Sequence, residues 1–339
     1  MLGWWQTTAD AWDPRLLAVV VVALLVSGSL TLWIRLGWRA VEGQPILPYE
    51  PRRPVPWTIV GLLVLALVSF MAITAFSLLY ADVDITKVFS LDVDAPSETI
   101  RRSAPVADDA ELITSAKLLT LVVSQLTALL AALIGFRWLY GATPEDWGLV
   151  TTHAGRDLGI ALIAAVAFLP PLYALQALLH QINDAPHPLI RALTESNDMF
   201  LRPLALVTAG LWAPIWEELF FRVIFQGWLE RVLVHRHAPP PDEAAVHDLS
   251  PDGETADEYA PAVRAPRGGW LPIAISAAVF ASVHVDPRSP NLDFIPIFFF
   301  ACGLGYLYQR THRALPSILL HMILNVCSLT ALVLTLPPR

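Results

Sequence analysis

The stretch LRPLALVTAGLWAPIWEELFFRVIFQGWLERVLV at residues 201–234 decides how the rest of this sequence is interpreted. It has the composition of a long apolar helix, yet Glu217, Glu218 and Arg222 fall near its middle. If such a helix crosses a bilayer, each charge near the centre costs about 2.5 to 3.5 kcal/mol on insertion scales. Three ionisable residues at that depth therefore indicate a functional site.

The composition predicts a membrane protein. Of the 339 residues, 55% are hydrophobic and only 15% are Asp, Glu, Lys or Arg. The apolar residues come in blocks of about 20, which is the length that crosses the hydrocarbon core of a bilayer. The net charge is -8, and no basic surface is offered to nucleic acid, so no nucleic-acid partner is expected. The sequence predicts an all-α, polytopic transmembrane bundle of about eight spans, with a membrane-embedded polar cavity.

Two regions are expected along the chain. Residues 1–196 form an N-terminal membrane region with four spans, at 16–34, 57–80, 112–136 and 157–180, the last of them kinked at Pro170-Pro171. Residues 197–339 form a second region with four apolar segments, at 201–234, 270–284, 291–309 and 315–336, interrupted by a mobile polar loop at about 236–269. A solvated turn is expected at residues 310–313.

The segment at 270–284 is short for a span. It reaches only about 22 Å at the helical rise, so we expect it to stop near mid-membrane. Residues 285–291 would then be irregular backbone that lines a water-filled cavity, which is the permitted exception for non-helical backbone at depth. Such an ending brings His284 to the level of Glu217.

Lys and Arg residues are more frequent in the loops after the first, third, fifth and seventh spans than in the alternate set. The positive-inside rule therefore favours a cytoplasmic position for the first set, which includes the Pro-rich loop after the first span. We expect a multi-pass integral protein of the bacterial plasma membrane, with its polar cavity opening toward the cytoplasm.

The polar residues fall at helical spacings that separate their roles. Glu218 and Arg222 are four residues apart and share a face, which favours a mutually neutralising pair, whereas Glu217 is rotated by about 100° and is left to face a cavity. In the same way His284 follows Phe280 by four residues, and His321 precedes Asn325 by four.

These groups suit hydrolysis by an activated water. Desolvation makes a carboxylate in a low-dielectric site a stronger base, so Glu217 could accept a proton from a water that an imidazole orients. His321 and Asn325 could donate to the oxyanion of a tetrahedral intermediate, a contribution of about 2.7 to 4 kcal/mol for each donor. No Gly-x-Ser-x-Gly motif offers a competing covalent nucleophile.

Three motifs in order resemble those of a known family. Residues 217–222 (EELFFR), 280–284 (FASVH) and 321–325 (HMILN) are similar to the EExxxR, FxxxH and HxxxN motifs of the CPBP family, which includes the type II CAAX prenyl proteases and the bacteriocin-processing proteins and is also called the ABI family. The resemblance covers roughly residues 197–336. Val223 is a departure, because many members have Gly after the arginine.

The resemblance implies an α-helical intramembrane endopeptidase. Glu217 and His284 would activate water, His321 and Asn325 would form the oxyanion site, and Glu218, Arg222 and Phe280 would support the architecture. The substrate would be a prenylated CAAX-like or other membrane-attached peptide. Some members have been described as metallopeptidases, in which case Glu217, His284 and His321 would bind zinc. Metal-free catalysis is favoured, because Asn325 is a poor zinc ligand and His-Glu-x-x-His is absent.

Two alternatives remain open from the sequence. The buried Glu, Arg and His residues could form the ion relay of a membrane transporter, although that class predicts inverted repeats and the sequence shows no internal symmetry of this kind. The chain could also be a non-catalytic membrane scaffold that keeps the fold for partner binding. For His321 and Asn325 alone, the structural alternative is a hydrogen-bonding role between helices.

Overall fold

The computed structural model describes residues 14–80, 114–182, 193–195, 198–234, 269–285 and 292–335, and every long element in them is helical. The expected polar loop at about 236–269 lies outside the described residues except for Gly269, as do residues 81–113 and 286–291. The helices are α1 (Pro14–Val41), α2 (Ile59–Tyr80), α5 (Ser115–Tyr140), α6 (Ala154–His180), α8 (Leu201–Val207), η2 (Thr208–Trp212), α9 (Ala213–Glu218), η3 (Leu219–Gln226), α10 (Gly227–Leu233), α12 (Trp270–Val283), α13 (Phe294–Thr311) and α14 (Ala314–Thr335).

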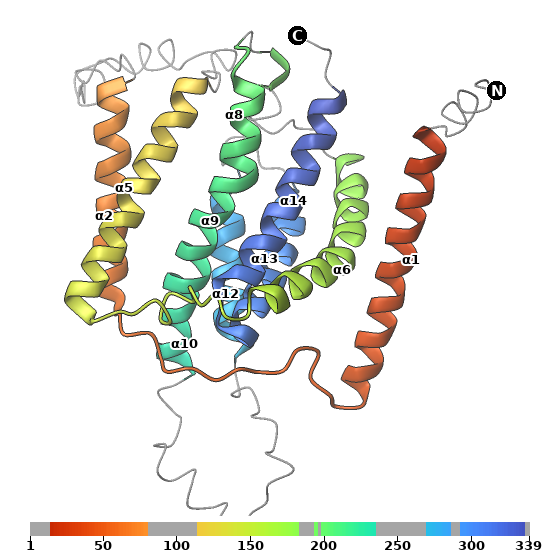
Figure 1. The fold of residues 1–339 in the computed structure, drawn as a ribbon, viewed down its shortest axis with the longest axis horizontal. Helices are drawn as coiled ribbons and strands as arrows, with labels where there is room; N and C mark the ends of the chain where they lie inside the picture. Colours follow the sequence, from red (N-terminus) through yellow and green to blue (C-terminus); the bar gives the residue numbers. More distant parts are fainter. Residues whose placement is uncertain are drawn as a thin grey trace, which may run out of the picture.

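The predicted all-α membrane bundle is confirmed. Six helical segments in the described residues are long and apolar enough to cross a membrane, and one of them is the continuous run from α8 to α10. As expected, α12 is shorter, with 14 residues. Together with α13 these segments make eight rods, most of which run side by side between two common ends (Figure 1). The chain is an integral membrane protein.

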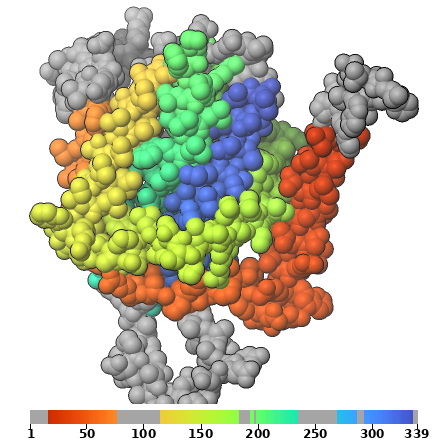
Figure 2. All heavy atoms as spheres, in the orientation of Figure 1, coloured from red at the N-terminus to blue at the C-terminus, as the bar shows by residue number. Residues whose placement is uncertain are grey.

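Helix α6 bends near its middle, where Pro170 and Pro171 fall inside it (Figure 1). Proline has no N–H, so Pro171 cannot donate to the carbonyl of Ala167 four residues earlier. Two groups of α1 take the place of that donor, because Ser29 Oγ and Trp33 Nε1 lie 3.1 and 2.9 Å from the Ala167 oxygen. The predicted kink therefore also makes the docking point for α1, which stands at one edge of the molecule (Figure 2).

The segment from Glu42 to Thr58 crosses one end of the bundle (Figure 1). Trp57 Nε1 donates to the Ile224 carbonyl at 3.0 Å, and this indole is fully buried in a core cluster with α2, α5, η3 and α14. The same segment covers the turn after α13, where Glu50 O lies 2.6 Å from His312 Nδ1. The expected solvated turn is therefore wrong, since His312 is only 5% exposed.

Asp146, in the loop between α5 and α6, ties this crossing segment to the bundle. Arg53 Nε and Nη2 donate to its two carboxylate oxygens at 2.8 and 2.6 Å, and the backbone N–H of Thr143 donates at 2.8 Å. Burial raises the pKa of the Asp146 carboxyl, but the hydrogen bonds from Arg53 and Thr143 outweigh it and hold the pKa below its ordinary value.

Candidate active site

The helix that carries the acidic pair is not a regular α-helix. Two π-helical stretches, η2 and η3, flank the α-helical turn of α9 that ends at Glu218. The sequence predicted one regular helix here, because periodicity does not distinguish a π-helical turn. Such turns are rare and often occur at functional sites.

The η2 stretch explains how Asn325 is held. The N–H of Ala213 donates to the carbonyl of Thr208 rather than to that of Ala209, and Pro214 has no N–H to offer. The Ala209 carbonyl therefore lacks its helical donor, and Asn325 Nδ2 of α14 donates to it at 2.8 Å. One of the two amide hydrogens of Asn325 is used in this bond, and the other stays available in the cavity.

Glu218 and Arg222 form a buried ion pair with both side chains fully inaccessible. Arg222 Nε donates to Glu218 Oε2 at 3.0 Å, and its Nη1 donates to Ser276 Oγ of α12 at 3.2 Å. The guanidinium carbon also lies 4.9 Å from the centre of the Phe280 ring. This pair joins η3 to α12, so both partners contribute to the packing of the core.

Each of the two histidines has one nitrogen engaged by a neighbour. His284 Nδ1 lies 2.7 Å from the Phe280 carbonyl, which can only accept, so this nitrogen carries the hydrogen. His321 Nδ1 lies 3.0 Å from Glu218 Oε1. The carboxylate of Glu218 therefore contacts Arg222 with one oxygen and His321 with the other. The bond to His321 was not predicted from the sequence.

The free nitrogens of both rings face Glu217. Glu217 Oε2 lies 3.7 Å from His284 Nε2 and 3.7 Å from His321 Nε2, and its side chain is 19% exposed. These separations exceed a direct hydrogen bond but suit a water molecule that contacts all three groups. The structure thus brings together Glu217, His284 and His321 from α9, the end of α12 and α14.

A cavity of about 410 Å³ contains this cluster. It is lined by Glu217, His284, His321 and Asn325, by the rings of Phe280 and Phe300, and by apolar residues of α13 and α14. Beyond the cluster it continues along α14 to Ser328, Leu329 and Leu332, with Gln176 of α6 on its wall. Gln176 and Ser328 were not predicted as cavity residues, because neither belongs to a motif.

The course of this cavity bears on orientation. Leu329 and Leu332 pack against the first residues of α8, at the end of the bundle opposite the segment from Glu42 to Thr58 (Figure 1). The cavity and that Pro-rich segment therefore lie toward opposite ends. The cytoplasmic position of the Pro-rich loop and the cytoplasmic opening of the cavity both stay predictions.

A zinc ion would take its ligands from Glu217, His284 and His321. In both histidines Nδ1 contacts a neighbouring acceptor, which fixes the orientation of the ring. Proteins orient metal-binding histidines in the same way. As the side chains are placed, however, no group of three His, Cys, Asp or Glu residues in the described part of the chain is arranged to hold a metal ion.

Comparison with known proteins found one family. Residues 199–327 match the family model described as type II CAAX prenyl endopeptidase Rce1-like. This range contains the acidic pair, both histidines and Asn325. The comparisons with curated proteins and with solved structures found no match.

Proposed function

We propose that this membrane protein cleaves peptides with a water activated by Glu217 and His284, because residues 199–327 match the family model of the Rce1-like type II CAAX prenyl endopeptidases. The match supports a CAAX-type intramembrane endopeptidase in general. The finer assignment of roles is our proposal, and it rests on one observation: Glu217 Oε2 lies 3.7 Å from the Nε2 of both histidines inside a cavity.

In the proposed reaction a water lies between Glu217 and His284. Since His284 Nδ1 carries a hydrogen, the neutral ring presents a lone pair at Nε2 and can accept a hydrogen bond from that water. Glu217 removes the other hydrogen of the water as a proton while the water oxygen bonds to the substrate carbonyl carbon. The same proton then passes to the leaving amine as the C–N bond breaks, so the carboxylate is regenerated.

His321 and Asn325 would stabilise the oxyanion. Asn325 has its second amide hydrogen for this purpose, and its bond to the Ala209 carbonyl fixes the plane of the amide. For His321 to donate from Nε2 to the oxyanion while its Nδ1 donates to Glu218, both ring nitrogens must carry a hydrogen, so the ring must be an imidazolium. The carboxylates of Glu217 and Glu218 would offset that positive charge. Removing one such donor typically costs about 2.7 to 4 kcal/mol of transition-state stabilisation.

We propose metal-free catalysis, supported by the poor ligand character of the Asn325 amide and by the absence of a His-Glu-x-x-His motif from the sequence. If zinc were bound, Glu217, His284 and His321 would hold it, and it would supply an activated water. Metal analysis of the purified protein together with cleavage after dialysis against a chelator tests this point. Stoichiometric zinc, with activity lost on its removal and restored on its return, would overturn it.

We further propose that the substrate is a prenylated CAAX-like or other membrane-attached peptide, and that the cavity opens toward the cytoplasm of a bacterial cell. This orientation places the end of α14 on the cytoplasmic side and the Pro-rich segment on the other. Accessibility of single cysteines placed at Glu42 and at Leu334 to an impermeant thiol reagent, in a Cys302→Ser, Cys327→Ser background, tests it. Labelling of Leu334→Cys from outside intact cells would contradict the proposed orientation.

The decisive experiment measures cleavage of a quenched farnesylated peptide by the purified full chain. Glu217→Gln and His284→Ala should each lower kcat by at least about 100-fold, the low end of general-base contributions. His153→Ala is the matched control, because His153 lies exposed before α6 and makes no side-chain capping bond. Unchanged cleavage in both site variants would remove the proposal, and so would loss of cleavage in the control.

A further inference from the structure

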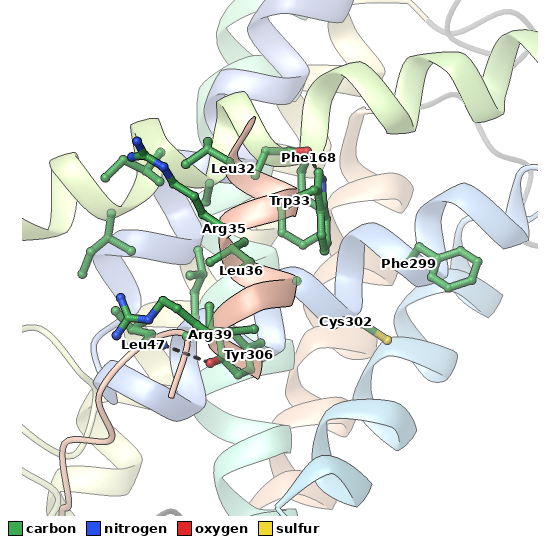
Figure 3. Close-up of a pocket in the computed structure, with 17 residues that line it drawn as sticks. Leu32, Trp33, Arg35, Leu36, Arg39, Leu47, Phe168, Phe299, Cys302 and Tyr306 are labelled. Carbon is green, nitrogen blue, oxygen red and sulfur yellow. Dashed lines mark hydrogen bonds between the residues drawn. The ribbon is translucent and has the colours of Figure 1, made fainter. Parts of the chain in front are cut away.

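A second cavity lies on the other side of α13 from the catalytic cluster. It occupies about 610 Å³ between α1, the first half of α6 and α13, and its walls are almost wholly apolar (Figure 3). The lining includes Ile163, Ala164, Phe168, Phe299, Cys302 and Gly303. We refer to this cavity as the α1 groove.

The α1 groove lies between two contacts that hold this part of the chain to the bundle, one within α1 and one just after it. Trp33 Nε1 and Ser29 Oγ hold one end through the carbonyl of Ala167. After α1 has ended at Val41, the backbone N–H of Leu47 donates to Tyr306 Oη of α13 at 3.3 Å. The intervening turns of α1 face α13 across open space.

Gly303 shapes the wall of the groove. A Cβ at this position would come within 2.6 Å of the Phe168 ring, so only glycine lets that ring lie against α13. Phe168 in turn packs edge-on against Trp33, with ring centres 6.0 Å apart. The junction of α1, α6 and α13 is therefore closely packed, and the neighbouring void is a formed feature of the fold.

The α1 groove is separate from the catalytic cavity, and the two share no lining residue. On α13, Phe300 faces the catalytic cavity, whereas Phe299 and Cys302 face the groove. A peptide bound at Glu217 would have to pass around α13 to place its lipid here. The groove is therefore poorly placed for the substrate of the reaction proposed above.

Two arginines stand at the side of the groove. Arg35 and Arg39 are four residues apart on α1, and both guanidinium groups extend to the same side of that helix (Figure 3). Among the described residues, neither side chain has an ion-pair or hydrogen-bond partner. Their helix has an apolar stretch that ends near these residues, so the charges lie close to the membrane surface.

We propose that the α1 groove binds one anionic phospholipid, with an acyl chain between α1 and α13 and the phosphate at Arg35 and Arg39. A void of this size inside hydrocarbon forfeits the contacts of its lining unless a chain fills it. Basic pockets between transmembrane helices are suited to anionic head groups. The bound lipid fills the space between α1 and the catalytic core without entering the active site.

Lipid binding by the purified full chain in mild detergent tests the proposal. Native mass spectrometry would follow titration with phosphatidylglycerol and, separately, with phosphatidylcholine. Wild type should retain one phosphatidylglycerol more tightly than phosphatidylcholine. The Arg35→Gln, Arg39→Gln double variant should bind phosphatidylglycerol about 30-fold more weakly, which corresponds to about 1 kcal/mol for each lost charge.

Two further variants locate the site. Ile163→Trp places a large ring on the groove wall, at a residue that is exposed and free of core packing, and should lower the retention of both lipids. Arg137→Gln is the matched control, since Arg137 is an exposed arginine in the last turn of α5, away from the groove. It should leave binding unchanged.

Three results would overturn the proposal. The first is equal phosphatidylglycerol binding by wild type and the double arginine variant, and the second is an equal loss in Arg137→Gln. The third is displacement of the bound lipid by a farnesylated peptide, which would assign the groove to the substrate. Peptide cleavage by Glu217→Gln is a separate readout, so the lipid site and the proposed reaction can fail independently.

Discussion

Replacing Glu218 with glutamine should destabilise the protein strongly, because Glu218 serves two buried partners at once. Its oxygens lie 3.0 Å from Arg222 Nε and 3.0 Å from His321 Nδ1, and the side chain is fully inaccessible. Glutamine keeps the shape but supplies one acceptor and one donor, so one partner meets a donor instead of an oxygen. Arg222 is also left without its counter-charge.

The magnitude follows from these contacts. Removing one partner of a buried ion pair costs about 3 to 5 kcal/mol, mainly because the remaining charge is uncompensated. Glu218→Gln should therefore lose about that much unfolding free energy. Glu217→Gln should lose less than about 1 kcal/mol, since Glu217 is partly exposed and has no partner closer than 3.7 Å among the described residues.

Reversible unfolding in a series of detergent mixtures with increasing dodecyl sulfate, followed by tryptophan fluorescence, measures both values. The double variant Glu218→Gln, Arg222→Met removes the uncompensated charge as well, so it should recover part of the lost stability without recovering cleavage. The reasoning would be refuted if Glu218→Gln unfolded like wild type, or if the double variant were no more stable than the single one.

Three other changes test separate contacts. Asn325→Ala leaves the Ala209 carbonyl without a donor, so it should lower the unfolding free energy by about 1 to 3 kcal/mol in the same assay and also lower kcat. A variant with wild-type stability would contradict the assigned hydrogen bond. Because the pKa of Asp146 is depressed in the folded state, its contribution to stability is present above about pH 4 and is lost as the pH falls through the folded pKa. Asp146→Asn should abolish this pH-dependent part of the unfolding free energy. An unchanged dependence of stability on acid pH in this variant would count against the Arg53 contact. Trp33→Phe removes one of two donors to the Ala167 carbonyl and should lower stability by about 1 kcal/mol with peptide cleavage retained, and a larger loss of cleavage than of stability would link α1 to the active site.

The positions of the helices could be predicted because the thickness of hydrocarbon sets the length of each apolar block. The end of the first helix could not, since α1 continues past Ile34 through Arg35 and Arg39 to Val41. A window of hydrophobicity stops at the first charge, whereas a long arginine side chain can reach the membrane surface from inside the helix. The bend of α6 was predictable, because the missing N–H of proline is a property of the residue itself.

Within the candidate site, the motif residues could be named in advance, but several of their contacts could not. Helical spacing pairs Glu218 with Arg222, yet it says nothing of the second oxygen, which contacts His321 on a different helix. The bond from Asn325 to Ala209 depends on a π-helical turn followed by a proline, and no apolar periodicity reports such a turn. His312 looked solvated because its burial comes from Glu50, far away in the chain.

The division of the chain near residue 196 stays a prediction, and so does the orientation in the membrane, which rests on counting Lys and Arg in the loops. That count treats each loop by itself, whereas the position of the cavity depends on how α8, α12 and α14 are arranged along the membrane normal. The loops and the active site become linked only through the folded bundle.

The η2 stretch has a consequence for how relatives of this domain should be compared. A π-helical turn holds one residue more than the α-helical turn it replaces, and one residue corresponds to about 100° of rotation. Everything after η2, including Glu217, is thus turned by that angle relative to Leu204 and Ala205. A relative whose equivalent helix is α-helical throughout would need a one-residue gap near Thr208–Trp212 for both halves of the helix to align with this one.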